Sequence, residues 1–206
     1  MLKLIRAFLV INAFVFSLSS CKHYVVKGKV IETGDEKFTV PYFNTSQKEY
    51  FYNADIKVFG NSIKGILVVK KLEGKRKRLA LLSEFGNTLF DFEMVDDNVN
   101  VIYIMEDLNK KVIVKKLKKY FQLLVNSEFK VEKRYDLEEG EIQISKLQGK
   151  RIFLSLNEDV ELINLRQASI FKSKVEISYF GDNEYADSIA FKSLELPITI
   201  NLEKRN

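Results

Sequence analysis

Pairs of adjacent carboxylates and a single histidine are the side chains of this 206-residue chain that could take part in acid–base catalysis. Two carboxyl groups suffice for a glycosidase, where one acts as acid and the other as base or nucleophile. With one histidine, His23, and one cysteine, Cys21, neither a histidine-based triad nor a His/Cys metal site can form. We therefore expect no enzyme activity, no catalytic residue and no metal. The carboxylate pairs fall at expected turns or helix starts, where charge is normally solvated: Asp96–Asp97, Glu106–Asp107 and Glu138–Glu139.

Cys21 belongs to a different chemistry, because it follows a segment with the layout of a secretory signal peptide. Residues 1–20 begin with two cations, continue with an apolar run over 7–16 that contains one polar residue, Asn12, and end in small residues. The run is too short to span a bilayer. The ending over residues 18–21, LSSC, resembles the bacterial lipobox, in which cleavage occurs before the cysteine and the thiol receives a diacylglycerol. The alternative is an ordinary signal peptide followed by an incidental cysteine.

The lipobox resemblance sets the expected domain boundaries and location. It implies a signal peptide over 1–20, a lipidated N-terminus and tether over 21–36, and one β-barrel-like domain over 37–206. The covalent diacylglycerol and N-acyl lipid on Cys21 would be a lasting anchor, since each buried methylene contributes about 0.8 kcal/mol; no cofactor is expected. Lys22 stands where an Asp would resemble an inner-membrane retention signal, and no acidic run follows. We therefore expect an outer-membrane anchor and a domain that faces the periplasm.

The charge of the chain argues against nucleic acid as a partner. Loss of residues 1–20 would reduce the 33 Lys and Arg residues to 31 against 28 acidic residues, a net charge of about +3. So small an excess, without an aromatic–basic binding motif, does not favour nucleic-acid binding.

Beyond residue 48, short apolar-rich segments alternate with turn residues, a pattern typical of strands joined by tight hairpins. Twelve such segments, give or take two, predict a mainly β fold: a curved antiparallel sheet or incomplete β-barrel of about 10 to 14 strands. The predicted strands are Lys48–Phe59, Ile63–Lys71, Lys77–Ser83, Thr88–Val95, Val99–Met105, Phe129–Tyr135, Glu141–Leu147, Arg151–Leu156, Val160–Leu165, Ile170–Phe180, Ser188–Lys192 and Ile198–Leu202.

One long segment has helical periodicity, and it predicts an amphipathic helix over about 107–126. Asp107 is the expected N-cap, and Asn126 is the expected C-cap in the left-handed conformation. Lysines fall mostly on one side of this helix. A lone amphipathic helix in a β-rich chain has to cover the sheet or the mouth of a barrel. The apolar residues of this predicted lid face are Ile113, Leu117, Tyr120, Phe121 and Leu124.

Two features each leave two interpretations open. Some predicted strands are apolar on both faces and need cover on both sides, around either a solid core or a cavity that holds acyl chains. These stretches are Ile66–Val69, Leu79–Leu82 and Val101–Met105. A basic run at the end of a hairpin is either a device that discourages aggregation or a contact for anionic lipid headgroups. The run consists of Lys75, Arg76, Lys77 and Arg78.

The middle of the chain, from about Tyr50 to Asn126, resembles the LolA/LolB lipoprotein carriers in the order of its elements. The match consists of the strand Gly65–Val69, a turn, the segment Arg78–Leu89, a further strand pair and a helix. The resemblance implies an incomplete antiparallel β-barrel closed by helices, whose apolar interior receives the acyl chains of lipoproteins. The chain departs from that family in lacking a helix before the first strand and in having one uninterrupted helix where the family has two.

The same resemblance singles out Phe85, in the turn over 83–87. In LolB-like receptors, a large apolar residue just before a Gly projects into solvent and helps to place cargo in the membrane. Phe85 precedes Gly86 in this way. Glu84 stands where the family has Pro, which predicts a less rigid loop. The alternative is that the Phe85 ring folds back onto a neighbouring strand.

These features together predict a lipoprotein without catalytic activity. The leading function is the binding or transfer of lipids or lipoprotein acyl chains in an apolar cavity. The alternative is a structural or adaptor lipoprotein with a filled core, which docks onto another protein of the envelope. The expected partners are thus membrane lipid through the anchor, acyl chains as ligand, and an envelope protein. An open apolar cavity of several hundred Å³ would favour the first function, since ligand sites typically measure about 300 to 1,000 Å³.

Overall fold

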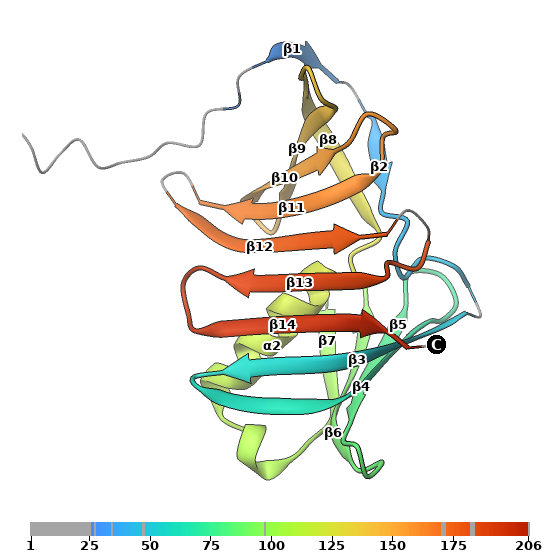
Figure 1. Ribbon diagram of the computed structural model, residues 1–206, viewed down its shortest axis with the longest axis vertical. Helices are drawn as coiled ribbons and strands as arrows, with labels where there is room; N and C mark the ends of the chain where they lie inside the picture. Colours follow the sequence, from blue (N-terminus) through green and yellow to red (C-terminus); the bar gives the residue numbers. More distant parts are fainter. Residues whose placement is uncertain are drawn as a thin grey trace, which may run out of the picture.

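One antiparallel sheet contains all the strands of the computed structural model, which describes residues 26, 28–33, 35–46, 48–96, 98–169, 172–181 and 184–205 (Figure 1). The strands follow the spatial order β1-β8-β9-β10-β11-β12-β13-β14-β3-β4-β5-β6-β7, and β2 also pairs with β8. The two ends of this path do not pair with each other, so the sheet stays open. The strands are β1 (Lys29–Glu32), β2 (Lys37–Thr39), β3 (Glu49–Val58), β4 (Asn61–Lys71), β5 (Lys77–Leu82), β6 (Thr88–Val95), β7 (Asn98–Ile104), β8 (Glu128–Asp136), β9 (Glu141–Leu147), β10 (Lys150–Leu156), β11 (Leu162–Ala168), β12 (Ser173–Phe180), β13 (Ser188–Ser193) and β14 (Ile198–Lys204).

The predicted fold class is confirmed: the chain is mainly β, with one open, curved antiparallel sheet and one covering α-helix. All twelve predicted strands are present, with small shifts at their ends. β1 and β2 were not predicted, and β1 lies inside the expected tether. Both are short and pair with β8 alone, and none of their residues whose burial is described is fully buried, so the alternation that reveals longer strands is missing.

Several predictions concern the N-terminal residues that the structure does not describe. The signal peptide over 1–20, the lipidated Cys21 and His23 all lie outside the described residues. Within the described part of the chain, no helix has both the length and the apolar character needed to cross a membrane.

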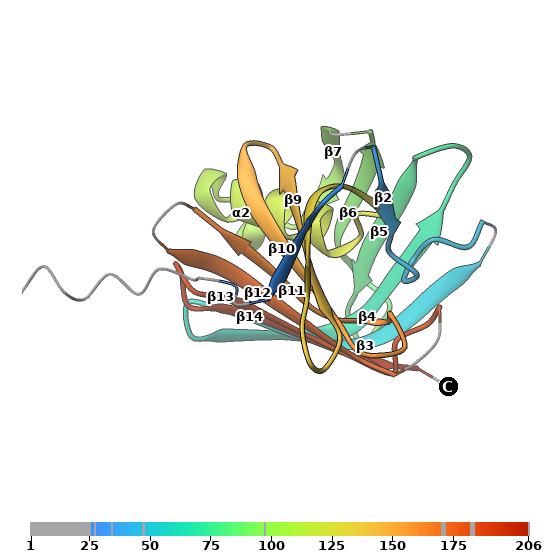
Figure 2. The same ribbon diagram turned by 90° about the horizontal axis from the view of Figure 1, so that it is seen from above.

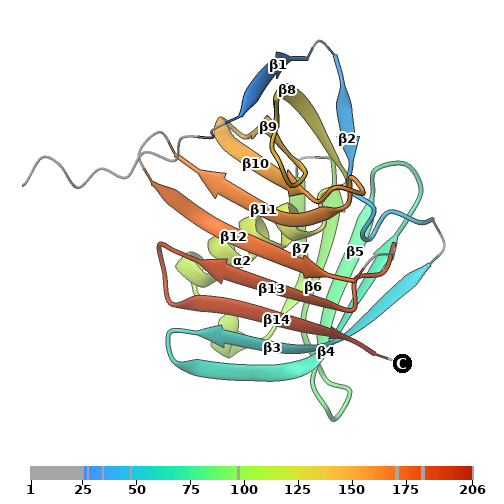
Figure 3. The same cartoon turned by 45° about the horizontal axis from the view of Figure 1, so that its top comes forward.

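Alternating burial along strands such as β3, β4 and β12 produces one apolar face and one wet face, and the sheet bends around the apolar one. In β3, buried and more exposed residues alternate along the whole strand. The bend brings distant strands to the same helix, α2 (Lys111–Leu124). The Phe121 ring lies 5.1 Å from Phe90 of β6, and the Tyr120 ring lies 4.9 Å from Phe191 of β13. Four strands separate β6 from β13, so the sheet forms a half-barrel around α2 (Figures 2 and 3).

The helix begins later than the sequence predicts, and both predicted caps are wrong. Residues 106–108 form a separate 3₁₀ turn, which is closed by a hydrogen bond from the Asn109 amide to the Glu106 carbonyl. Lys110 is extended and occupies the N-cap position without a side-chain bond, so Asp107 caps nothing there. At the other end, Val125 is the C-cap, with φ −103° rather than a left-handed value.

Candidate functional site

The predicted lid face of α2 lies against the concave side of the sheet. Leu117, Tyr120, Phe121 and Leu124 are buried, and Ile113 packs against them while partly exposed. The lid face therefore points into the half-barrel rather than along its rim.

Aromatic rings fill the space beneath α2. Phe90 and Phe92 of β6 stack with their centroids 4.8 Å apart, and Phe121 packs on both of them. Aromatic side chains bury large apolar areas and dominate the energetics of such a core.

A small set of polar contacts attaches α2 to the strands. The Tyr120 hydroxyl shares a buried hydrogen bond of 2.8 Å with the Ser193 hydroxyl of β13. The Lys116 ammonium lies 3.6 Å from a Glu195 carboxylate oxygen. At the end of the helix, the ammonium of Lys77 donates a hydrogen bond to the carbonyl of the C-cap residue. The side-chain amide of Gln148, in the β9–β10 turn, donates a hydrogen bond of 3.0 Å to the side-chain oxygen of Gln122 on α2. Apolar contact, which is not directional, supplies much of the remaining attachment.

The interior is a filled core rather than a preformed acyl cavity. The described cavities lie at the surface and have mixed or mainly polar linings. A further pocket beside Tyr120 measures only about 20 Å³, roughly the space of one water molecule. The structure thus favours the solid-core interpretation in the described state.

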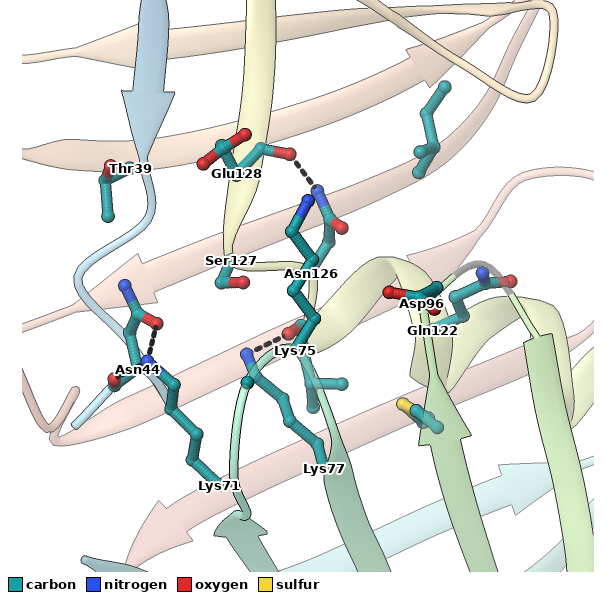
Figure 4. A pocket seen from close by; sticks show the side chains of 14 residues that line it. Thr39, Asn44, Lys71, Lys75, Lys77, Asp96, Gln122, Asn126, Ser127 and Glu128 are labelled. Carbon is teal, nitrogen blue, oxygen red and sulfur yellow. Dashed lines mark hydrogen bonds between the residues drawn. The ribbon is translucent and has the colours of Figure 1, made fainter. Parts of the chain in front are cut away.

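A cavity of about 390 Å³ lies where the two edges of the sheet approach each other. Thr39 of β2 and Glu128 of β8 line it from one edge, and Met94 and Asp96 line it from the other (Figure 4). Asn126, just after α2, lies between them and donates a hydrogen bond of 2.6 Å to the Glu128 carbonyl. The end of α2 therefore occupies the gap that keeps the half-barrel from closing.

Lys77 is the unusual residue of this gap. It is only 4% exposed, and its ammonium reaches the Val125 carbonyl at the C-terminal end of α2. Burial, together with the nearby charge of Lys71, lowers the pKa of Lys77 to about 7. Lys71 is itself held by the carbonyl and side-chain oxygens of Asn44, at 2.7 and 2.9 Å (Figure 4). A buried, easily neutralised lysine thus fixes the helix end.

Three of the four cations in the basic run are buried or paired within the protein, and a contact with anionic lipid stays a prediction. Lys77 is buried, while Arg76 and Arg78 pair with the carboxylates of Glu93 and Asp91 at 2.6 Å each. These pairs raise the pKa of both guanidinium groups. Of the predicted lipid-contact residues, only Lys75 is left exposed without such a pair in the described structure. This favours the interpretation of the basic run as a charged hairpin end that discourages aggregation.

Phe85 projects into solvent at the tip of the β5–β6 hairpin and is 92% exposed. The alternative in which its ring folds back is therefore wrong. The Gly86 amide donates to the Ser83 carbonyl at 2.9 Å, and the Asn87 amide donates to the Ser83 hydroxyl at 3.1 Å. The loop of three residues between Ser83 and Asn87 requires a residue with a left-handed φ, and Gly86 supplies it with φ 81°. These bonds define the tip although Glu84 replaces the proline.

The largest described cavity is a groove of about 780 Å³ between the edge strand β7 and α2. Asn98 and Asn100 of β7 form one wall, and a row of lysines on α2 forms the other. The sequence predicted that β7 is covered on both faces, but this is wrong. Val101 and Ile102 are 37% and 54% exposed, because β7 is the last strand of the path and has a neighbour on one side only.

The carboxylate pairs show no sign of an active site. Glu106 and Asp107 lie exposed on the 3₁₀ turn, and Glu138 and Glu139 lie exposed between β8 and β9. Asp96 is described at its turn, but its neighbour in the pair is not. No group of three or more potential ligand side chains in the described ranges is placed to hold a metal ion. The absence of catalysis stays a prediction.

Two residues of this site were missed by sequence reasoning. Lys77 was assigned to the exposed basic run, although it shares the inward face of β5 with Leu79 and Leu81. That alternation was the signal that could have placed it inside. Ser193, the partner of Tyr120, gave no signal, because a serine at the end of a strand is common on exposed faces.

Comparisons with known proteins give no family for this chain. No family model matches it, and no curated protein matches its sequence. Among solved structures, it is similar to a domain from Vibrio parahaemolyticus named for outer membrane lipoprotein sorting, with 6% identity and a TM-score of 0.46 over 78% of this chain and 86% of that chain. It is also similar to a DUF1329 family protein from Desulfovibrio piger, with 9% identity and a TM-score of 0.40 over 80% and 86%. At TM-scores below 0.5, these similarities assign no function.

Proposed function

We propose that this protein is a non-catalytic lipid-binding lipoprotein of the bacterial envelope, anchored in the outer membrane through Cys21 and facing the periplasm. In this proposal, the acyl chains of a lipid or lipoprotein enter the half-barrel when α2 moves aside. The observation that carries the proposal is the way the concave apolar face is covered. The sheet is open along one seam, and the described cover over that seam is a single amphipathic helix.

The energies of the exchange support a binding role. The five apolar side chains of the lid face contribute roughly 8 to 15 kcal/mol through burial, at about 1.5 to 3 kcal/mol each. An acyl chain of about sixteen methylenes would contribute roughly 13 kcal/mol on the same scale. Because the two quantities are similar, an acyl chain could replace the helix face without a large net change in free energy. A protein that must release its ligand needs such a balance.

The connections of α2 suit this movement. On the N-terminal side, Asn109 and Lys110 leave the helical conformation between the 3₁₀ turn and α2. On the C-terminal side, Val125 to Ser127 connect α2 directly to β8. The polar attachments of the helix are few enough for ligand binding to offset their loss, at about 1 kcal/mol for a typical hydrogen bond.

A second function is favoured by the filled interior itself. A structural or adaptor lipoprotein needs a stable core and an exposed contact residue, and Phe85 at the hydrogen-bonded hairpin tip is such a residue. In this function, the protein docks onto another envelope protein and α2 stays in place.

Native mass spectrometry together with hydrogen exchange separates the two functions. The chain from Lys22 to Asn206 would be incubated with phospholipid and freed of excess lipid. Lipid binding predicts a protein–lipid mass together with faster amide exchange in α2, since the helix leaves the sheet. The adaptor function predicts the mass of the protein alone and unchanged exchange. Bound lipid without any change in α2 would contradict the lid mechanism.

A further inference from the structure

The groove between β7 and α2 has a uniform charge. Lys111, Lys115, Lys118 and Lys119 line it, and none of them forms an ion pair among the described contacts. Their spacing of three and four residues places the ammonium groups along one side of the helix. None of the eleven described residues that line the groove is acidic. The groove is therefore complementary to an anionic ligand.

A neighbouring titratable group responds to the same positive potential. Lys150 follows the β9–β10 turn, whose Gln148 lines the end of the groove. Burial lowers the pKa of Lys150, and the charges of Lys119 and Lys174 lower it further. The Glu195 carboxylate acts in the opposite direction without cancelling the effect. Positive charge thus dominates at this end of the groove.

Apolar side chains form part of the groove. Val99 and Val114 line the groove between the polar walls. Val99 pairs with Met94 on the inward side of the sheet, so this lining is continuous with the core of the half-barrel. On the same two elements, Val112 of α2 is 63% exposed and Ile102 of β7 is 54% exposed. The groove therefore offers lysines for an anionic group and an apolar path that leads inward.

We propose that the groove binds the anionic phosphate headgroup of a membrane phospholipid, with its acyl chain directed over Val99 and Val114 toward the interior. The chain path rests on the proposed lipid-binding function, whereas headgroup recognition by the lysines stands independently. An acidic polypeptide would also match the charge. It would have no use for the apolar lining, which an amphiphilic ligand accounts for together with the lysines.

Vesicle sedimentation with matched charge variants tests this proposal. The chain from Lys22 to Asn206 would be mixed with vesicles of phosphatidylcholine alone or of phosphatidylcholine and phosphatidylglycerol in equal parts. The groove variant is Lys115→Glu with Lys118→Glu, and the control is Lys57→Glu with Lys64→Glu on β3 and β4, outside the groove. All four lysines are exposed or half-buried, so circular dichroism should show folded proteins. We expect the groove variant to bind the anionic vesicles at least about tenfold more weakly and the control variant to bind them nearly as the wild type does.

Several results would overturn the proposal. Equal binding to both kinds of vesicle, or equal weakening by the control variant, would show that the groove does not recognise the headgroup. Displacement from the vesicles by polyglutamate at low concentration would instead identify an acidic polypeptide as the partner, and displacement by inorganic phosphate would identify a free-phosphate site.

If the groove variant loses vesicle binding but no form ever acquires lipid by native mass spectrometry, the proposed function fails while the groove inference stands. If the groove variant and the wild type acquire lipid equally, the groove inference fails while the proposed function stands.

Discussion

The half-barrel is filled in two different ways, by the loop over 40–46 and by α2, which lie on different sides of the concave face in Figure 2. The loop inserts Phe43, whose ring packs edge-on against Tyr50 at 5.3 Å and Tyr52 at 5.7 Å. Tyrosine hydroxyls then bind main-chain groups: Tyr42 donates to the Leu162 carbonyl at 3.1 Å, and Tyr52 donates to the Ala186 carbonyl at 2.9 Å. α2 inserts Phe121 in a similar way, but most of its polar contacts join one side chain to another.

This difference indicates which part of the interior can move. Phe43 is held at φ 57°, a conformation that costs a non-glycine residue about 1 kcal/mol or more and persists only where the surroundings fix it. The Tyr42 bond to the Leu162 carbonyl of β11 and the Lys71 bonds to Asn44 would have to break before the loop could leave. α2 can leave by giving up apolar contacts that a ligand would restore, together with a few polar ones. We therefore expect the loop to stay in the core and α2 to be the part that moves in the proposed lid mechanism.

The largest effect should come from truncating the central ring of each part. Phe43→Ala and Phe121→Ala should each lower the free energy of unfolding by about 3 to 5 kcal/mol, because both rings are fully buried. Urea unfolding measures this loss. Lipid acquisition, followed by native mass spectrometry, should change only in Phe121→Ala. An equal change in both variants would remove the distinction between loop and lid.

A pH effect should come next in size and should belong to the lid side. The pKa of Lys77 is about 7 in the folded protein, below its ordinary value of 10.5, so the unfolded chain binds more protons between these two values. The contribution of this residue to stability should therefore rise by roughly 3 kcal/mol between pH 7 and pH 9.5 and stay constant below about pH 6.

Lys77→Met isolates this contribution, because it removes the titrating group and keeps the apolar stem. The difference in unfolding free energy between wild type and variant should follow the predicted rise with pH. A difference that does not vary with pH would show that the helix-end carbonyl keeps the ammonium charged, as cations at helix C-termini often are.

Removing a single hydroxyl near the loop or on α2 should have a smaller effect on the free energy of unfolding. Tyr52→Phe and Tyr120→Phe should each cost about 1 kcal/mol, which differential scanning calorimetry would resolve. Hydrogen exchange should distinguish them, because only Tyr120→Phe releases α2 from Ser193. Faster exchange of the α2 amides in Tyr52→Phe would count against independent behaviour of the two parts.

The smallest effect on stability should be at the hairpin tip, outside both parts. Phe85→Glu should change the unfolding free energy by less than about 0.5 kcal/mol, because the ring is almost fully exposed. Association of the unlipidated protein with liposomes should weaken, since the ring would contribute about 1.5 to 3 kcal/mol on burial. Phe85→Leu is the matched control and should retain most of the binding. Unchanged association of Phe85→Glu would mean that the tip does not meet lipid.

The sequence predicted those features of the fold that depend on repeated patterns. Period-two burial identified the long strands, and period-3.6 burial identified the lid face from Ile113 to Leu124. Prediction from the sequence failed where a single tertiary contact decides the conformation. Buried Leu108 accompanies the 3₁₀ turn that delays the start of α2, and no local pattern separates that turn from the helix that follows. Lys77 was missed for another reason: the alternation along β5 placed it inside, but its neighbours in sequence are exposed cations.

The candidate site was predictable only in part for the same reason. The lid face and the exposed hairpin tip are local features of the sequence. The β7–α2 groove arises because β7 is the last strand of the sheet, and strand order is set by long-range pairing. The lysines of α2 were visible in the sequence, but their position across from an uncovered strand edge was not.

The pairing of β1 with β8 has a consequence for how the molecule would stand on a membrane. Only seven residues separate Cys21 from Lys29, the first residue of β1, and a fully extended chain of that length reaches about 25 Å. β1 lies at one end of the long axis of the molecule, and the hairpin that carries Phe85 lies at the other (Figure 1). A lipid on Cys21 would therefore hold the β1 end near its own bilayer and direct Phe85 away from it. In that orientation, Phe85 would meet a donor that approaches across the periplasm, and lipid would pass from that donor to the anchoring membrane along the length of the protein.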